Sequence, residues 1–121
     1  MTALRAPTPP KGLSTAGKRL WRAVLGEFEL DEHERLVLIE ACRTSDRLDA
    51  LSAAADGEPL VVLNARGDRT ASPYLVEARQ QSITLIRLLA SLRLPSGDEA
   101  DMTRPQRRGG ARQPYGPRAM P

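Results

Sequence analysis

Residues 59–73 read PLVVLNARGDRTASP, and this stretch decides how the chain folds. A short run of branched apolar residues is followed by turn-forming residues and then by a second short extended segment, which is typical of a β-hairpin. Gly67 supplies the positive φ that the turn needs, and the side chains of Asn64 and Asp68 favour turns. We therefore predict a hairpin at about residues 60–71.

The turn contains the tripeptide RGD at residues 66–68, which many adhesive proteins use to bind integrins. The chain has one cysteine, nothing that resembles a secretory signal, and no apolar stretch of the ~18–20 residues that a membrane span needs. These features are typical of a reducing compartment. We interpret RGD as the tip of the turn, where Arg66 and Arg69 are candidate contacts to a polyanion or to a neighbouring subunit.

Upstream of the hairpin, the first expected helix follows a basic leader, residues 1–12, that we expect to be flexible. Pro9-Pro10 cannot lie inside a helix, whereas Ser14 offers a hydroxyl to the N–H groups of a helix start. Apolar residues then repeat with the helical period, so we expect a helix from about Thr15 to Glu27. They are Leu20, Trp21, Val24, Leu25 and Phe28.

The second expected helix begins at Asp31. Asp31 and Glu34 form a D-x-x-E pattern close to a capping box, and three acids in the first turn suit the helix dipole. Apolar residues continue the period to Ala55, after which Gly57 takes a left-handed cap and Pro59 blocks continuation. The helix is about 25 residues, or ~38 Å, long. Its single cysteine, Cys42, is most simply a small core residue.

Downstream of the hairpin, Ser72 and Pro73 stand as N-cap and first residue of a third helix that we expect to run to about Leu94. Its second half, SITLIRLLASLRL, is apolar almost all around the cylinder. A helix apolar on every side has to be enclosed, and two other helices of so short a chain do not easily surround it. We predict burial between subunits, with an intramolecular core or a coiled-coil dimer as alternatives. The expected interface residues are Ile83, Ile86, Leu89 and Leu92.

The chain of 121 residues has room for one domain, which we place at residues 13–95, followed by a basic tail at 96–121. The net charge of +3 is segregated: residues 1–22 carry five cations and no acid, and residues 23–60 carry ten acids against three arginines. Basic ends around an acidic middle suit a protein that meets a polyanion, although such charges can also serve only solubility. The low-complexity tail is expected to be disordered in isolation, and it can bind nucleic acid, fold on a partner or be inert.

Residue patterns that support catalysis are missing from the sequence. It has one histidine, His33, and one cysteine, with no grouping at metal-ligand spacing, no phosphate-binding loop of the form G-x-x-x-x-G-K-[ST] and no nucleophile elbow. We expect a protein that is not an enzyme and that needs no cofactor or metal.

The order of these segments resembles the phage terminase small subunits of the P27 type. The resemblance begins with PPKGLSTAGKRLWRAV, where Gly12-Leu13-Ser14, Gly17 and Leu20-Trp21 stand at the characteristic spacing. It continues through EACRTSDRLDAL, the hairpin segment and PYLVEARQQSITLIRLLASLRLP, so that it covers about residues 9–95. Many members have Gly where this chain has Arg93.

The resemblance implies a non-catalytic subunit that assembles into a ring of many copies, binds double-stranded viral DNA at the packaging start, and recruits and regulates the large ATPase-nuclease subunit. It also implies a location in the cytoplasm of the infected bacterial host. A dimeric small DNA-binding regulator and a phage structural adaptor that ignores nucleic acid are the alternatives. A strict helix-turn-helix is not expected, because the second helix opens with acids that phosphates would repel. The cations expected to contact DNA phosphates are Lys11, Lys18, Arg19, Arg22, Arg104, Arg107, Arg108 and Arg112.

Overall fold

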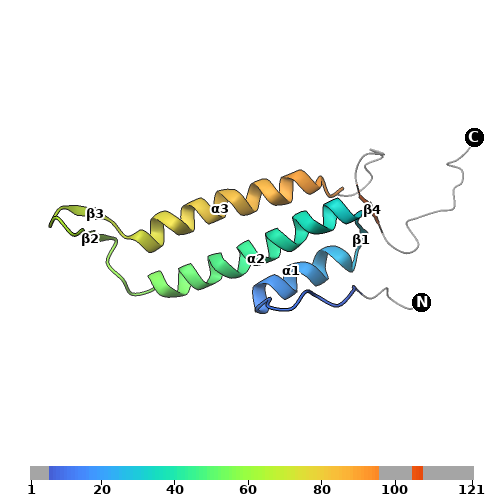
Figure 1. Ribbon diagram of the computed structural model, residues 1–121, viewed down its shortest axis with the longest axis horizontal. Coiled ribbons are helices and arrows are strands. Elements are labelled where there is room, and N and C mark those ends of the chain that lie inside the picture. Colours follow the sequence, from blue (N-terminus) through green and yellow to red (C-terminus); the bar gives the residue numbers. More distant parts are fainter. Residues whose placement is uncertain (1–5, 96–104, 108–121) are drawn as a thin grey trace, which may run out of the picture.

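The computed structural model describes residues 6–95 and 105–107 (Figure 1). Most of the described chain is helical, in α1 (Thr15–Leu25), α2 (Glu32–Ala55) and α3 (Pro73–Leu92). The helix α2 packs against both others: α3 runs antiparallel along its length, and α1 lies beside its N-terminal half (Figure 1). The expected mainly α fold with a hairpin between the second and third helices is thus confirmed. None of these helices is long and apolar enough to cross a membrane.

The signals that bound α2 act as expected. The capping box is present, with the backbone N–H of Asp31 donating to Glu34 Oε1 at 2.7 Å. At the other end Gly57 has a φ of 83°, a conformation that glycine adopts without a Cβ clash. The helix therefore ends where the sequence predicts, and the chain turns toward the hairpin.

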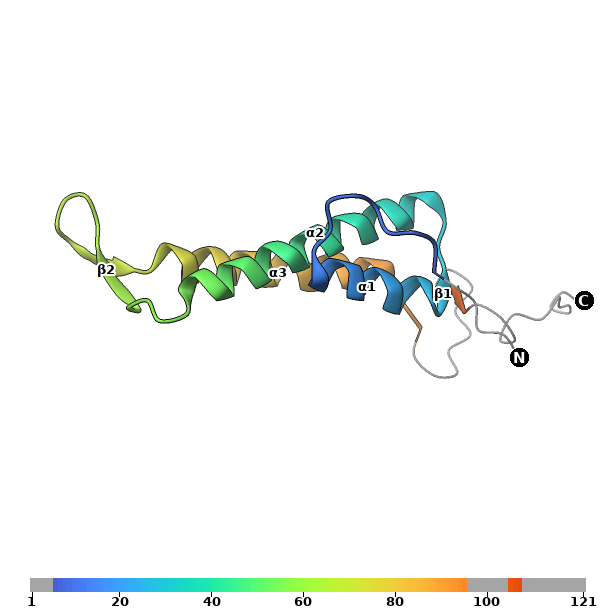
Figure 2. The ribbon, with the colours of Figure 1, turned by 90° about the horizontal axis from the view of Figure 1, so that it is seen from below.

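The hairpin consists of β2 (Val61–Leu63) and β3 (Arg69–Ala71), which pair antiparallel with Val62 opposite Thr70. Gly67 has a φ of 85°, and Asn64 Oδ1 accepts the N–H groups of Arg66 and Asp68 at 2.9 and 3.0 Å. The RGD tripeptide is thus the tip of a turn held by the Asn64 side chain. The hairpin extends beyond the ends of α2 and α3 (Figure 2).

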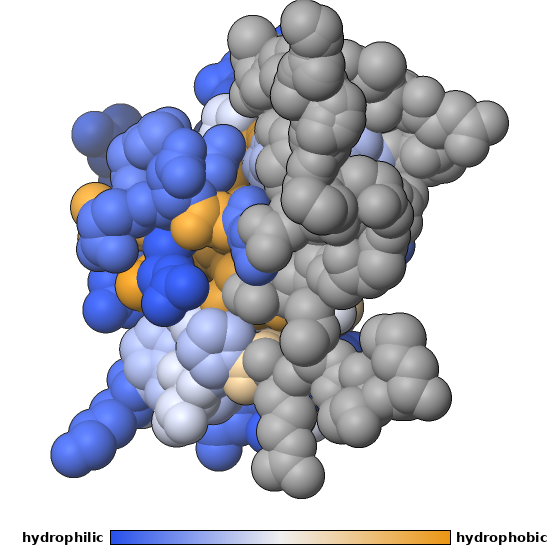
Figure 3. Space-filling view, turned by 90° about the vertical axis from the view of Figure 1, so that its right-hand side faces the viewer, coloured by the Kyte–Doolittle hydropathy of each residue, from blue (hydrophilic) through white to orange (hydrophobic). Residues whose placement is uncertain are grey.

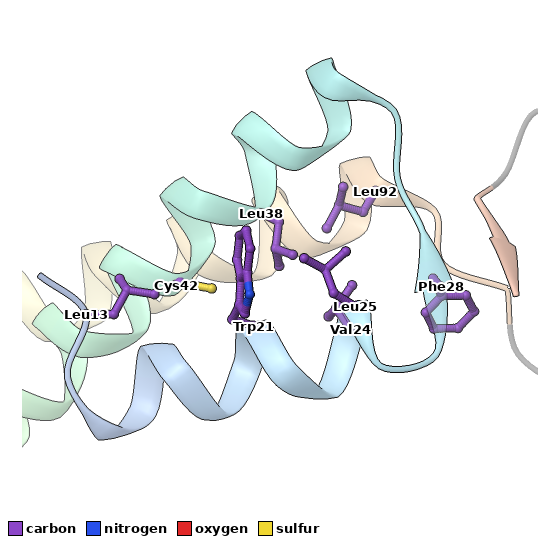
Figure 4. Packing of buried hydrophobic residues seen from close by; sticks show 8 residues of the cluster. All are labelled: Leu13, Trp21, Val24, Leu25, Phe28, Leu38, Cys42 and Leu92. Carbon is purple, nitrogen blue, oxygen red and sulfur yellow. The ribbon is translucent and has the colours of Figure 1, made fainter. Parts of the chain in front are cut away.

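The core lies at the other end of the molecule, where all three helices meet (Figure 4). Trp21 is 2% exposed and projects from α1 toward α2, and Leu25 and Leu38 are fully buried beside it. Leu92 closes this core from α3. Cys42 belongs to the same cluster and is fully buried, as expected for a small core residue.

Two short strands at this end were not predicted. Helix α1 stops at Leu25, two residues before the expected Glu27, and the chain continues into β1 (Phe28–Glu29), which pairs antiparallel with β4 (Gln106–Arg107). Within the expected tail the structure describes Pro105 and these two residues, and residues 96–104 and 108–121 lie outside the described residues. In the described part of the leader, the carbonyl of Pro7 accepts a hydrogen bond of 2.6 Å from Trp21 Nε1.

Helix α3 begins at Pro73, as predicted, but ends at Leu92 rather than near Leu94. Arg93 follows in the left-handed conformation, with φ 53° and ψ 43°. A left-handed residue at this position ends a helix, and it is most often glycine. The backbone thus adopts a glycine-like cap although the residue is arginine.

Candidate nucleic-acid interface

The candidate interface is built on α1, and a carboxylate from α2 fixes this helix. Asp46 accepts the N–H of Ser14 through Oδ2 and the N–H of Gly17 through Oδ1, each at 2.7 Å. These are the N-cap and third residues of α1, whose N–H groups have no partner within the helix. Asp46 therefore caps α1 from a different helix. The expectation that the Ser14 hydroxyl does so is wrong, since the side chain of Ser14 makes no capping bond.

Gly17 makes this close approach possible. A Cβ at this position would lie 2.6 Å from Asp46 Oδ2 and 2.8 Å from the backbone oxygen of Cys42. Both separations are shorter than real Cβ contacts, so only glycine lets α1 and α2 come this near to each other. Sequence reasoning missed the role of Asp46, but a glycine inside an expected helix is a signal of close packing.

Three cations lie on the side of α1 that faces away from this contact. Lys18, Arg19 and Arg22 are exposed, and they fall within roughly a third of the helix circumference at 3.6 residues per turn. Gly17, Trp21 and Val24 occupy the buried side. The structure thus brings three of the predicted DNA contacts together on one open surface.

Lys11 lies just before this helix and is also exposed. The four cations, Lys11, Lys18, Arg19 and Arg22, are called the α1 basic surface below. None of them forms an ion pair within the part of the chain that the structure describes, where the salt bridges join Glu40 to Arg43 and Arg47. Their charge is therefore available to an external anion.

Of the four cations in the tail that are predicted to contact DNA, the structure describes only Arg107. Arg104, Arg108 and Arg112 lie outside the described residues. Arg107 is in β4, where its backbone is paired with Phe28. That pairing attaches this part of the tail at the end of the molecule where α1 stops. Seen from this end, apolar residues are visible between polar ones on the described part of the surface (Figure 3).

The four predicted interface residues of α3 do not share one environment. Ile83 and Ile86 are 40% and 66% exposed, so their side chains are open to a partner. Leu89 is partly buried against the core, and Leu92 is 2% exposed within it. Leu92 is a correction to the prediction, because the turn of α3 that carries it faces α1 and α2 rather than the surface.

Acidic and sulfur groups near the site have structural explanations. Ligand atoms of Asp31, His33 and Glu34 lie within 4.8 Å of one another, but Asp31 and Glu34 are already engaged in the capping box of α2. Burial, and to a lesser degree the negative charge of Asp46, raises the pKa of the Cys42 thiol to about 11. A thiol in that state is a poor nucleophile at neutral pH.

Arg35 contributes an unpredicted contact beside the core. Its guanidinium lies 6.0 Å from the centroid of the Trp21 ring, at the limit of a cation–π interaction. Its Nε is buried and has no hydrogen-bond partner among the described residues. The guanidinium of Arg35 on α2 thus lies at the edge of contact with the Trp21 ring of α1.

Comparisons with models of known protein families, with curated proteins and with solved structures find no match for this chain.

Proposed function

We propose that this chain is the small subunit of a viral DNA-packaging terminase of the P27 type. In this role it binds double-stranded viral DNA at the packaging start and recruits and regulates the large ATPase-nuclease subunit. Copies assemble into a ring in the cytoplasm of the infected bacterium. The proposal rests on the segment order that resembles this family and on the α1 basic surface.

The observation that carries the DNA-binding part is the open arrangement of these cations. Unpaired, exposed Lys and Arg side chains on one face of a fixed helix can neutralise several phosphates at once and release their counterions. Such contacts position a protein on DNA and carry little sequence information by themselves. Repetition of the surface around an assembly would add avidity.

The ring is proposed on a separate observation. The face of α3 that turns away from α2 exposes several large aliphatic side chains, including Ile83 and Ile86. A closed ring covers such surfaces without open-ended growth. A two-fold dimer would also cover them, and it belongs to the alternative of a small DNA-binding regulator.

The test is the salt dependence of binding to a short DNA duplex, measured by fluorescence anisotropy. The double substitution Lys18→Gln/Arg22→Gln removes two cations from the α1 basic surface. The control Arg43→Gln/Arg47→Gln removes the same charge from an exposed part of α2. We expect the first variant to lower the slope of log K against log salt by about 0.9 per lost contact, and the control to leave it unchanged.

Two outcomes count against the proposal. Equal effects of the two variants would mean that net charge, and not the α1 surface, attracts the DNA. Absence of any salt-dependent binding would favour the adaptor that ignores nucleic acid. Native mass by light scattering separates the ring from the regulator, since the regulator has twice the mass of the chain.

A further inference from the structure

The second half of α2 has a side that α1 does not cover. Asp46 faces α1, because it accepts hydrogen bonds from the first N–H groups of that helix. Side chains three and four positions apart lie on one side of a helix, so Asp49, Ala50, Ala53 and Asp56 continue the side that Asp46 begins. All four are exposed, since α1 lies only beside the N-terminal half of α2 (Figure 1). We call these four residues the α2 shelf.

The α2 shelf is acidic. Residues 48–60 carry three acids and no cation. The last turn of α2 has no basic residue either, so the negative end of its helix dipole has no counter-charge there. The cations that precede the shelf on α2 are Arg43 and Arg47, and both are directed at Glu40, at 3.2 and 3.8 Å. The α2 shelf therefore favours a partner that brings positive charge.

The outward side of α3 combines aliphatic side chains with arginines. Val76, Ile83 and Ile86 are exposed there, at 42%, 40% and 66%. Arg79 and Arg87 are also exposed, and they lie on this side because each is four positions from Ile83. We call these five residues the α3 stripe.

The α3 stripe contains no acid. The only acid of α3 is Glu77, which accepts a hydrogen bond of 2.8 Å from Gln81. Gln81 and Leu88, further along the same side of the helix, are partly buried. Glu77 thus belongs to the flank of α3 that turns toward α2, and the outward side is positively charged.

The α3 stripe and the α2 shelf match in charge and in spacing. The two arginines of the stripe are eight residues apart, or ~12 Å along the helix, with Ile83 midway between them. The two acids of the shelf are seven residues apart, or ~10.5 Å, with Ala53 near the middle. In one register each arginine meets an acid, and the large Ile83 packs on the small Ala53. Opposite charges on both sides of an apolar contact favour that register.

We infer that the α3 stripe of one copy of this chain packs on the α2 shelf of the next copy. The inference rests on the proposed ring and specifies its contact. One chain cannot make this contact with itself, because its α3 stripe faces away from its own α2. Two different surfaces of each subunit meet between copies, which is the heterologous interface that a ring requires.

Charge reversal with rescue tests this contact. The stripe variant Arg79→Glu/Arg87→Glu and the shelf variant Asp49→Arg/Asp56→Arg each place like charges across the interface. We expect either variant to raise the concentration at which half of the chains are assembled by about tenfold or more, measured by sedimentation velocity. A chain with all four substitutions should recover assembly, because the pairs are restored with reversed signs. The four residues are exposed, so the fluorescence of the buried Trp21 should stay unchanged.

The matched control is Arg43→Glu/Arg47→Glu, which reverses two exposed cations of α2 outside the shelf. We expect it to leave assembly unchanged. Equal weakening by the control would mean that net charge governs assembly, and it would overturn the inference. A shelf variant that weakens assembly beside a stripe variant that does not would mean that the shelf binds another segment, such as the basic tail. A chain with all four substitutions that stays dissociated would show that the two surfaces do not pair.

Disulfide cross-linking tests the centre of the contact. Chains with Ala53→Cys and chains with Ile83→Cys, distinguishable by tag length, are co-expressed and oxidised with diamide. The native Cys42 can remain, because it is fully buried. A disulfide forms only where two Cβ atoms come within about 3.5–4.5 Å, and we expect a mixed dimer as the main product.

The control for the cross-link is Ala54→Cys in place of Ala53→Cys. Ala54 is also exposed, but it lies about 100° further around the same helix. We expect little cross-linking from it to Ile83→Cys. Equal yields from both alanine positions would mean random collision and would overturn the inference. Dimers of the Ile83→Cys chain alone would do so too, because two α3 stripes would then meet around a two-fold axis.

Native mass and duplex binding are measured on the same samples. An assembly that binds DNA but shows neither the rescue nor the mixed cross-link counts against this contact alone. A cross-linked assembly without DNA binding counts against the proposed function and leaves the contact standing. A cross-linked species of only two chains counts against the ring, and it also leaves the contact standing.

Discussion

Replacing Gly17 by alanine tests how α1 is held on α2. The added Cβ would lie 2.6 Å from Asp46 Oδ2, 2.8 Å from the backbone oxygen of Cys42 and 3.0 Å from Asp46 Cγ. The carboxylate can rotate away, but only by giving up its hydrogen bonds to Ser14 and Gly17. The Cys42 oxygen is part of α2 and cannot move without shifting that helix. The substitution therefore has to separate α1 from α2.

The two effects of this substitution have opposite signs. Alanine in place of glycine inside a helix stabilises it by about 1 kcal/mol. Overpacking of a close contact costs about 1–3 kcal/mol, and each hydrogen bond to a charged group is worth about 1.5–3 kcal/mol. Because the Asp46 bonds lie near the surface, we use the lower end of that range. The net expectation is a loss of about 3–5 kcal/mol in the free energy of unfolding.

The assay is urea unfolding followed by the fluorescence of Trp21, the only tryptophan of the chain and 2% exposed in the core. Protein concentration is held constant, because assembly contributes to apparent stability. The control Ala23→Gly reports the alanine–glycine difference on the exposed side of the same helix, where about 1 kcal/mol is expected. If Gly17→Ala stabilises the protein by a similar amount, the close contact with α2 has no energetic weight and the reasoning is refuted.

Three further predictions follow from particular residues. Asp46→Ala leaves two N–H groups of α1 without their acceptor and should destabilise the protein by about 1–3 kcal/mol in urea unfolding. In the double variant Gly17→Ala/Asp46→Ala, part of the penalty of Gly17→Ala should be relieved, because the carboxylate that the new Cβ meets is gone. Arg93→Gly should be more stable than Arg93→Ala by about 1 kcal/mol in thermal unfolding, because both variants lose the side chain but only glycine accepts the φ of 53° without strain. Because the pKa of Cys42 is raised to about 11 in the folded protein, the folded state keeps the thiol proton at pH values where the unfolded state has lost it. The free energy of unfolding should therefore be highest below pH 9. It should decline by an amount on the order of 2 kcal/mol as the pH rises from 9 to about 11. The Cys42→Ala variant should lack this decline, and an unchanged pH profile would contradict the assignment.

Local signals predicted most of the fold. Three helix boundaries depend only on residues within a few positions of them, so they can be predicted without tertiary structure. They are the capping box at Asp31, the stop at Gly57 and the start at Ser72-Pro73. The hairpin was predicted for the same reason, since Asn64 and Gly67 build the turn from their own backbone and side-chain atoms. These elements appear in the structure within two or three residues of their expected bounds.

The missed features all depend on partners distant in sequence. Asp46 is 32 residues from Ser14, and nothing in the local pattern identifies it as the cap of α1. Strand β4 is too short and too polar to stand out, and it exists through its pairing with β1. Leu92 belongs to the same apolar pattern as Ile86, so the pattern alone could not show that Leu92 is buried inside the chain and Ile86 is not.

The segregation of charge along the sequence has a partly internal explanation. Helix α1 has no acid in its first turn, so the positive end of its dipole is unbalanced by its own residues. The acidic α2 supplies that charge through Asp46, while Glu40 is used by Arg43 and Arg47 on its own helix. Asp46 of α2 thus anchors α1 on one side, and on the other side the cations of α1 have no ion-pair partner among the described residues. If DNA binds there, loosening this anchor by Gly17→Ala should weaken duplex binding even though no cation is removed, since a helix that moves independently presents its charges in no fixed arrangement.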